Sequence, residues 1–308
     1  MSQDGPFWPT LPRQGQRRDK RTRERERAQA GPDAPRARTE RPAPPAMRDE
    51  ETPRPRDPRR DELRVFGFNA CLAAFAARPH DLRKAYLSAS RMGALRELMA
   101  YCVAQRLGYR VVEDEDLARL TGTSHHEGVC LDMRRPQELT LDAVLAQLPE
   151  SQPACMLWLD GVGNPHNFGA VLRSAAHFGI AAVLLPGDSE LALSGAACRV
   201  AEGGAEAVPL VRLGDDAEAI GTLQAAGFRL AATVPRDGQS LFGVRLPERT
   251  VFVLGAEREG MQHELIQRCD LRLTIPGTGQ VESLNIASAV AVLLGAFASS
   301  GAHSSTAR

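Results

Sequence analysis

The sequence predicts an α/β fold whose C-terminal half contains a parallel sheet. Two observations support this prediction. First, short apolar runs typical of buried strands alternate with helical stretches between residues 63 and 298, as in repeated strand–helix units. Second, three of these strands are followed by loops rich in glycine and polar residues, and each loop leads into an apolar helix. The carboxyl ends of parallel strands are where α/β proteins bind ligands.

Charge is unevenly distributed along the chain. The 308 residues contain 38 Lys and Arg and 38 Asp and Glu, but residues 1–60 hold 16 of the basic residues and only ten of the acidic ones. This segment is rich in Arg and Pro and nearly empty of aliphatic residues, so we expect a disordered basic arm. Such an arm can add phosphate attraction, or it can be a solvating tail. Residues 299–308 are expected to be disordered as well.

The composition argues against several classes of protein. No apolar run reaches the roughly 18 residues of a membrane span, and the stretch 286–298 suits a core helix instead. The N-terminus lacks the apolar segment of a signal peptide. The six cysteines are scattered and include no CxxC pair, which is typical of a reducing compartment. We therefore expect a cytoplasmic protein with no membrane segment and no metal site.

Residues 63–135 are expected to form a small α/β domain. Its predicted elements alternate along the chain, in the order helix 66–77, strand 83–89, helix 92–107, strand 109–113, helix 114–122 and strand 128–134. Apolar residues at three- and four-residue spacing predict the helix at 92–107. Residues 136–152, with a short predicted helix between two proline-containing breaks, are expected to be a linker.

Residues 153–298 are expected to form the second domain. Six apolar runs bounded by turn residues predict its strands, at 155–160, 181–186, 207–213, 228–235, 250–255 and 271–276. Helical stretches separate the strands, and this arrangement favours parallel pairing. No G-x-G-x-x-G pattern follows the first strand of either domain, so a Rossmann-type dehydrogenase or methyltransferase is not expected.

The first polar loop, NPHNFGAVLRSA at 164–175, places Asn167, Gly169 and Arg173 at a predicted helix start. Asn167 is a candidate cap for that helix. Gly169 permits close approach of a ligand or a neighbouring chain. Arg173 lies one turn further on, near the face that meets the loop, and its guanidinium can bond to phosphate or hydroxyl oxygens in pairs. An ordinary capped helix with a surface arginine fits the same pattern.

The second loop, LGAEREGM at 254–261, places two glycines around Glu257. This pattern favours a tight loop whose main chain contacts a ligand while Glu257 orients a polar group. A solvated turn fits the pattern equally well, because glycine and charged residues are common in both.

The third loop, IPGTGQVESLNIASA at 275–289, combines Pro276 with two glycines and then opens a long helix of small apolar residues. Ser283 could cap that helix, which would be a purely structural role. Asn285 is expected one turn inside the apolar helix, where a buried amide needs hydrogen-bond partners. The three loops together point to a ligand site more strongly than any one of them does.

In order and spacing, the three loops resemble the motifs of the SpoU (TrmH-type) RNA methyltransferases of the SPOUT superfamily. The resemblance covers about residues 63–298 and implies a deep trefoil knot in the second domain, which periodicity could not indicate. The phrase GTSHHEGVCLDM at 122–133 is similar to the end of that family's L30e-like substrate-binding domain. The resemblance also implies a homodimer in which the second copy completes the active site.

The resemblance assigns site residues by motif. The catalytic set that it implies is Asn167, Arg173, Glu257, Ser283 and Asn285. The implied cofactor is S-adenosylmethionine, and the residues implied to line its site are Ala232, Thr233, Leu254, Gly255, Gly260, Ile275, Gly279, Ser283 and Leu284. No metal is implied.

The expected function is transfer of a methyl group from S-adenosylmethionine to a ribose 2′-hydroxyl of tRNA or rRNA. Arginine is a poor base, so we expect Arg173 to position the hydroxyl while a phosphate or water takes its proton. Two alternatives stay open. One is a non-catalytic RNA-binding or ribosome-assembly factor on the same scaffold, and the other is a base methyltransferase. The pattern does not name the RNA, although Arg83, Lys84, Arg91 and Arg96 in the first domain could contact phosphate.

Overall fold

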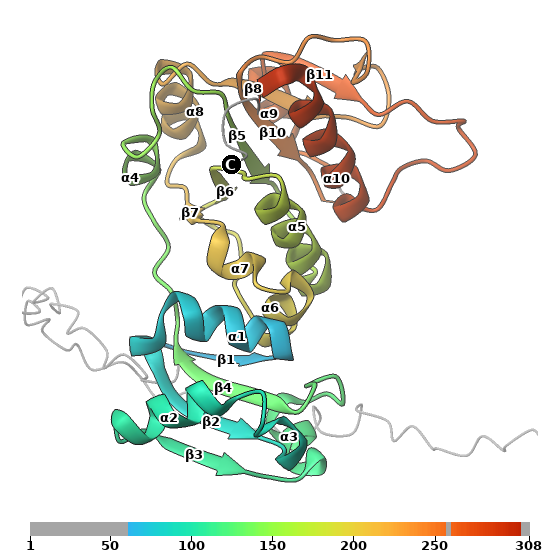
Figure 1. Cartoon of the computed structure of the whole chain (residues 1–308). Helices are drawn as coiled ribbons and strands as arrows, with labels where there is room; N and C mark the ends of the chain where they lie inside the picture. Colours follow the sequence, from blue (N-terminus) through green and yellow to red (C-terminus); the bar gives the residue numbers. More distant parts are fainter. Residues whose placement is uncertain (1–60, 257–259, 303–308) are drawn as a thin grey trace, which may run out of the picture. The chain divides into compact units, whose positions relative to one another are not determined.

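The structure, a computed structural model, describes residues 61–256 and 260–302. The predicted basic arm at 1–60, Glu257 in the second loop and the end of the chain at 303–308 lie outside the described residues. The described part contains two sheets, one of four strands and one of seven (Figure 1).

The four-stranded sheet has the order β1-β4-β2-β3. Its strands are β1 (Glu62–Phe66), β2 (Leu82–Leu87), β3 (Gly108–Val111) and β4 (Val129–Arg134). β4 runs antiparallel to both β1 and β2, and β3 runs parallel to β2. The helices between the strands are α1 (Phe68–Ala77), α2 (Arg96–Ala104) and α3 (Asp114–Thr121). β1 was not expected, because the exposed Glu62 and Arg64 interrupt its apolar pattern.

The seven-stranded sheet has the order β7-β6-β5-β10-β8-β11-β9, and all its strand pairs are parallel. Its strands are β5 (Ala154–Leu159), β6 (Ala182–Leu185), β7 (Leu210–Arg212), β8 (Arg229–Thr233), β9 (Gln239–Ser240), β10 (Arg249–Leu254) and β11 (Leu271–Thr274). Each of the six runs predicted as strands overlaps one of them, and only the two-residue β9 was not expected. The predicted α/β fold with a parallel C-terminal sheet is confirmed.

Helices cover both faces of this sheet (Figure 1). They are α4 (Leu141–Leu145), α5 (Pro165–His177), α6 (Gly195–Ala201), α7 (Gly204–Ala207), α8 (Asp216–Ala225), α9 (His263–Arg268) and α10 (Ile286–Phe297), and a π-helical turn follows at Ala298–Ala302. Alternate residues of β5 face opposite cores: Leu157 packs in the core that includes α5 and α10, and Trp158 packs in the one that includes α8. Burial on both faces explains why the strand is continuously apolar.

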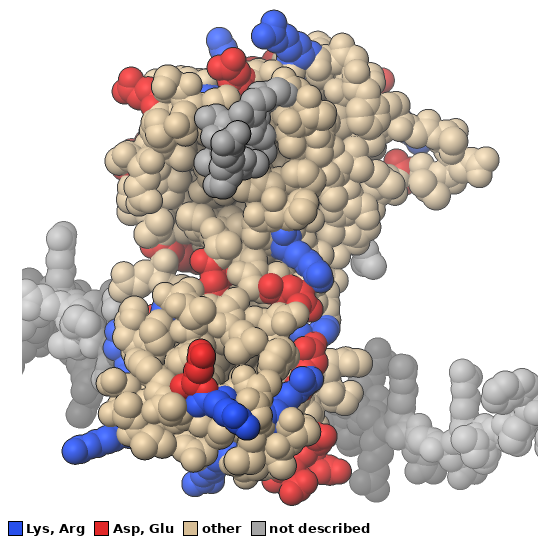
Figure 2. All heavy atoms as spheres, viewed as in Figure 1, with Lys and Arg blue, Asp and Glu red and all other residues tan. Residues whose placement is uncertain are grey.

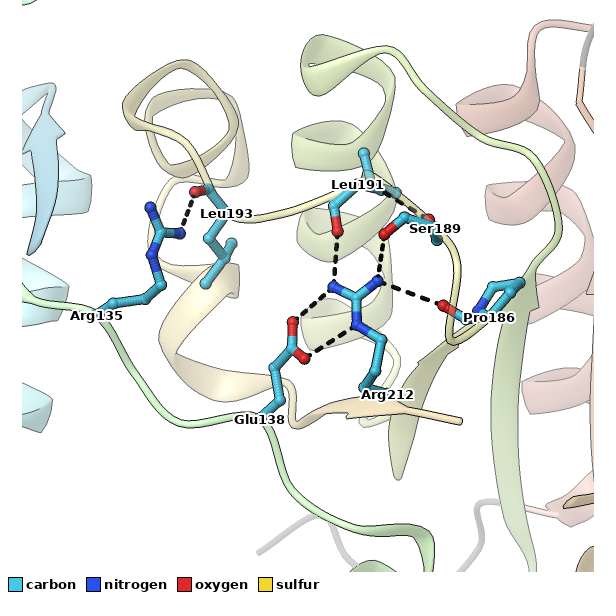
Figure 3. A network of polar contacts seen from close by, with 7 residues as sticks. All are labelled: Arg135, Glu138, Pro186, Ser189, Leu191, Leu193 and Arg212. Atoms are coloured by element: carbon cyan, nitrogen blue, oxygen red, sulfur yellow. Dashed lines mark hydrogen bonds and ion pairs between the residues drawn. The ribbon is translucent and has the colours of Figure 1, made fainter. Parts of the chain in front are cut away.

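The segment that precedes the parallel sheet is bonded to its edge (Figure 3). Leu139 forms a parallel bridge with Val211 on β7. The Arg212 guanidinium makes two bonds to the Glu138 carboxylate, at 2.8 and 3.0 Å. It also donates to three main-chain oxygens of the loop after β6, those of Pro186, Ser189 and Leu191. One side chain therefore holds the connecting segment and this loop together. Within the described ranges, no helix is long and apolar enough to cross a membrane.

Candidate active site

The strand order brings the three predicted loops to one edge of the parallel sheet. β10 lies between β5 and β8, and β11 lies beside β8. The three loops follow β5, β10 and β11, so they leave the sheet at the carboxyl ends of its central strands. This is the edge where parallel α/β proteins bind ligands. β8 ends at Thr233, between the second and third loops.

A hydrogen bond joins the first and third loops through two predicted site residues. Asn285 Nδ2 donates to Asn167 Oδ1 at 3.1 Å, although the two residues are 118 positions apart. Asn167 lies in the first turn of α5, and Asn285 is the residue just before α10. The two helices pack against each other (Figure 1). The contact therefore sits between two helix starts.

The helix caps differ from those predicted. α5 is capped by Asn164, whose Oδ1 accepts a first-turn N–H at 2.9 Å, and not by Asn167. α10 is capped by Asn285, whose Oδ1 accepts a first-turn N–H at 2.9 Å, and not by Ser283. Asn285 is also exposed, so it is not a buried amide inside the helix. Asn and Ser both cap helices well, so two candidates a few positions apart cannot be distinguished by residue type.

Gly169 is needed for packing inside the chain. A β-carbon at this position would lie 2.5 Å from the main-chain oxygen of Ala197 and 2.8 Å from Val200 Cβ. Both neighbours belong to α6. The close approach that the glycine permits is therefore made by α6 and not by a ligand.

Arg173 lies apart from the Asn167–Asn285 pair within one chain. It is six residues beyond Asn167 on α5, which corresponds to a rise of about 9 Å and a turn of about 240° around the helix axis. Its exposed side chain lines a hollow of about 580 Å³ together with His177 and Glu202. The structure therefore brings Asn167 and Asn285 of the predicted catalytic set into contact, whereas Arg173 of the same chain lies away from them.

The second loop is closed by its own main chain. Ala256 and Gly260 exchange two N–H···O bonds of 3.0 Å. A β-carbon on Gly255 would collide with the main chain of Gly260 and Met261, so this glycine is required by the loop itself. Gly260 has a φ of +74°, and no described atom lies within 4 Å of where its β-carbon would be. Gly260 is therefore the more open of the two glycines.

A buried carboxylate at the end of β5 was not among the predicted site residues. Asp160 is 6% exposed. Its N–H donates to the Leu254 oxygen at 2.8 Å, and its Oδ2 accepts the Gln262 N–H at 3.1 Å. Asp160 thereby ties β5 to both sides of the second loop. A charged residue directly after the apolar run MLWL is the sequence signal that could have identified it.

The third loop is open to solvent. All ten residues from 276 to 285 are exposed, and they include the apolar side chains of Val281 and Leu284, which are 71% and 45% exposed. No described atom lies within 4 Å of the β-carbon positions of Gly277 and Gly279. Exposed apolar side chains on an open glycine loop fit contact with an organic group or with another protein surface.

The other residues predicted to line a cofactor lie at strand ends. Ala232 is fully buried, so only its main chain could meet a ligand. Thr233 Oγ1 donates to the Val253 oxygen at 2.9 Å. Leu254 is 3% exposed, and Ile275 is half-buried. Among the described residues, no three His, Cys, Asp or Glu side chains are placed to hold a metal ion.

The edge of the sheet near β5 and β7 is acidic. The pKa of Asp216, the first residue of α8, is raised by burial and then by the carboxylates of Asp160, Asp188 and Asp215. Repulsion among carboxylates disfavours a further negative charge here. This part of the edge therefore suits a cationic or neutral ligand better than a phosphate.

Comparison with solved structures establishes the fold. The chain matches an S-adenosylmethionine-bound rRNA methyltransferase from Sinorhizobium meliloti with a TM-score of 0.66 and 20% identity, over 78% of this chain and 88% of the other. It also matches the SpoU methyltransferase AviRb from Streptomyces viridochromogenes, in complex with the same cofactor. The TM-score is 0.66 and the identity 21%, over 80% of this chain and 92% of the other. The fold is that of the SPOUT methyltransferases.

Comparison with protein families then places the chain more closely. Residues 154–295 match the SpoU rRNA methylase family, and residues 64–139 match the RNA 2′-O ribose methyltransferase substrate-binding family. An uncharacterized tRNA/rRNA methyltransferase of Escherichia coli O157:H7, YfiF, is 38% identical over 77% of this chain and 68% of its own length. The 23S rRNA (guanosine-2′-O-)-methyltransferase RlmB of Nitrosomonas europaea is 33% identical over 75% of this chain and 88% of its own length. The chain belongs to the SpoU rRNA methylase family.

Proposed function

We propose that this protein transfers a methyl group from S-adenosylmethionine to a ribose 2′-hydroxyl of ribosomal RNA. The observation that carries the proposal is the Asn167–Asn285 hydrogen bond. It joins two loops of the predicted catalytic set at the edge where α/β proteins bind ligands. The relatives named as 23S rRNA 2′-O-methyltransferases support rRNA as the acceptor and the ribose as the site of methylation.

The residues at this edge fit the cofactor. Ile275 and Leu284 offer apolar contacts, whereas the buried Leu254 belongs to the core beneath them. Gly260 and Gly279 leave the main chain of two loops accessible. Sites for small organic ligands combine such apolar walls with a few polar groups. When bound, S-adenosylmethionine supplies a methyl group on a positively charged sulfur, and the acidic character of the edge near β5 is compatible with that charge.

The side chains of the predicted catalytic set act by positioning. Methyl transfer needs the acceptor oxygen in line with the methyl group at about 3 Å, and a fixed geometry supplies much of the rate acceleration. The Asn167–Asn285 contact fixes the third loop against α5. The guanidinium of Arg173 can hold the ribose hydroxyl or a neighbouring phosphate by paired bonds. Arginine keeps its proton, so a phosphate oxygen or a water accepts the proton of the hydroxyl.

We also propose that the active unit is a homodimer in the cytoplasm. Arg173 is turned away from the Asn167–Asn285 pair of its own chain by the geometry of α5. It can complete a site only if that site belongs to a second copy. The exposed Val281 and Leu284 on the third loop are suited to contact with that copy or with the cofactor.

The predicted deep trefoil knot and the division of the chain at 63–135, 136–152 and 153–298 are also proposed. The two separate sheets and the two family matches support this division. The buried apolar side chains of both sheets nevertheless form one continuous cluster. The two parts are therefore expected to unfold in a coupled manner.

The test is transfer of labelled methyl from S-adenosylmethionine into total RNA from a strain that lacks this gene. RNA is digested to nucleosides afterwards, and an Arg173→Ala variant is assayed in parallel. Label in a 2′-O-methylnucleoside of large-subunit rRNA, lost with the variant, is expected. Label in a base would overturn the ribose assignment. Cofactor binding without transfer to any RNA would favour a non-catalytic RNA-binding factor.

A further inference from the structure

The first sheet carries a polar hollow that the proposed methyl transfer does not use. Its volume is about 320 Å³, near the lower end of the range for small-ligand sites, about 300–1,000 Å³. It lies where β2 ends and β4 begins, and the start of α3 forms part of its wall. Every side chain that lines it is polar. An all-polar lining is suited to a ligand that is rich in hydrogen-bonding atoms.

His126 offers a hydrogen-bond donor at this hollow. The residue is 6% exposed, and its Nδ1 accepts the Gly128 N–H at 3.1 Å. A neutral imidazole that accepts through Nδ1 carries its proton on Nε2. Among the residues that the structure describes, Nε2 has no hydrogen-bond partner. Nε2 is not among the buried side-chain atoms that lack a partner, so it is open to the hollow, where it can donate to water or to a ligand.

Arg91 is held in place with its terminal nitrogens available. Its Nε donates to the Glu127 oxygen at 2.9 Å, and its guanidinium carbon lies 4.7 Å from the centre of the Phe68 ring. The ring and this bond limit the rotamers of the side chain. Within the described part of the chain, neither terminal nitrogen is bonded. A guanidinium fixed in this way can donate to, or stack on, an unstacked base.

The backbone around the hollow is shaped to keep it open. Glu127 has a φ of +55° and Gly128 a φ of +79°. A β-carbon at Gly128 would lie 2.6 Å from Ser88 Oγ and 2.8 Å from Arg91 Cγ. A side chain there would displace two lining residues. Left-handed backbone at a non-glycine residue is costly and clusters at ligand sites.

The hollow offers acceptors as well as donors. The Ser88 and Ser90 hydroxyls are 2.9 Å apart, so one of them donates to the other and one O–H remains for a ligand. Asp114 adds a carboxylate to the lining. The Glu127 carboxylate accepts the Phe68 N–H at 2.9 Å, at the start of α1. With one arginine and two carboxylates, the lining does not favour a simple anion.

The surface charge around the first sheet also does not favour a site for a simple anion. Figure 2 shows basic and acidic side chains interspersed on the visible face of the half that contains the first sheet, and not one continuous basic field. Binding through phosphate attraction alone needs clustered Lys and Arg. Recognition of a base and its ribose needs mixed donors and acceptors instead.

We propose that this hollow binds one unstacked nucleotide of the RNA substrate, distinct from the nucleotide that receives the methyl group. Arg91 and His126 donate to acceptor atoms of the base, and Asp114 accepts from its N–H groups. This proposal rests on the proposed function, because that function makes RNA the substrate. Proteins commonly read RNA through bases in single-stranded loops that are free to leave the stack.

The first experiment compares two variants of the hollow with a matched control. Ser90→Ala removes a hydroxyl without a change in charge, and Arg91→Ala removes the guanidinium. Arg119→Ala removes the same charge from α3, where Arg119 makes an exposed pair with Asp116 and a bond to the Glu115 main-chain oxygen within the same helix. The probe is large-subunit rRNA from a strain that lacks the gene, at one fixed salt concentration. Affinities for rRNA and for S-adenosylmethionine, methyl transfer and thermal unfolding are measured.

We expect Ser90→Ala to weaken rRNA binding about fivefold and Arg91→Ala more than tenfold, as for lost base contacts. KM for rRNA should rise while kcat at saturating rRNA, cofactor affinity and Tm stay near wild type. Arg119→Ala should bind within about twofold of wild type, because a single phosphate contact at most is lost. Wild-type rRNA affinity in both hollow variants, with methyl transfer intact, would overturn the proposed nucleotide site in the hollow. The proposed methyltransferase function would then still be supported.

Photo-crosslinking of the unaltered full chain gives a second readout that does not depend on a variant folding. The rRNA carries 4-thiouridine or 6-thioguanosine, and crosslinked peptides are identified by mass spectrometry. Crosslinks in segments 88–91 and 124–128 are expected. Crosslinks confined to other segments would contradict nucleotide binding in the hollow, even if methyl transfer occurs. Crosslinks here without any methyl transfer would support the hollow and reject the proposed function.

Discussion

At the scale of single residues, Asn285 has two roles that can be separated. Its Oδ1 caps α10, and its Nδ2 donates to Asn167. Serine is a good cap but too short to reach Asn167, whereas alanine does neither. We expect Asn285→Ser to keep a Tm near wild type with much reduced methyl transfer. Asn285→Ala should lose transfer and also about 1 kcal/mol of stability.

Thermal unfolding and a labelled-methyl assay on both variants check this prediction. Ser283→Ala is the matched control for stability, because Ser283 does not cap α10. Full turnover by Asn285→Ser would mean that the bond to Asn167 has no part in the reaction.

The cysteines allow a prediction about pH. All six are free thiols. Burial raises the pKa of Cys130 and of Cys198 to about 12, and that of Cys269 to about 11. The thiolate is the reactive form, so at pH 8 these thiols should react far more slowly with Ellman's reagent in the folded chain than in urea. The rate should rise with pH. Rapid labelling of Cys130 in the folded state would contradict the burial.

At the scale of elements, the contact between α5 and α6 depends on Gly169. An added methyl group there would overlap α6, so Gly169→Ala should cost about 1–3 kcal/mol of unfolding free energy through overpacking. Gly221→Ala in α8 is the matched control. Gly221 is exposed in a helix interior with no described atom within 4 Å of its β-carbon position, so alanine there should stabilise by about 0.5–1 kcal/mol. Urea unfolding measures both, and equal effects at the two positions would refute the packing role.

Arg212 connects several elements at once, as Figure 3 shows. Its side chain is 26% exposed and its partner Glu138 is 35% exposed. We expect Arg212→Ala to cost about 2–3 kcal/mol, because several carbonyl groups and a carboxylate lose a charged donor. Arg212→Lys should recover only part of this, since lysine lacks the planar fork. Arg119→Ala, at an exposed pair, should change stability by less than about 0.5 kcal/mol.

Urea unfolding again provides the measurement. Limited proteolysis of the same variants should show faster cleavage within the loop 186–193 for Arg212→Ala alone. An unchanged cleavage pattern together with unchanged stability would show that the network contributes nothing to the loop.

At the scale of the whole molecule, the proposed sharing of one site between two copies predicts complementation. Arg173→Ala and Asn285→Ser should each have little activity as homodimers. A heterodimer of the two, purified through two different tags, keeps one site with both residues intact and should regain about half of wild-type turnover. If each chain builds its own complete site, the heterodimer will stay inactive. Sedimentation of the wild-type chain provides the control for dimer formation.

Much of the local structure followed from sequence patterns. Apolar runs of strand length located the six main strands of the parallel sheet, because a strand buried on both faces must be apolar throughout. Glycine and polar residues after β5, β10 and β11 marked the edge that carries the candidate site. These signals are readable because each depends only on neighbours within a few residues. β1 was not predicted because charged residues interrupt its short apolar pattern.

Only the tertiary structure decided which of these local features meet. The strand order placed Asn285 against Asn167 across 118 positions and assigned the close approach at Gly169 to α6. It also assembled the hollow of Arg91 and His126 from the ends of separate strands. Contacts between distant segments depend on the path of the whole chain. Residue periodicity determines which face of an element is buried, but it carries no information about which other element lies against that face.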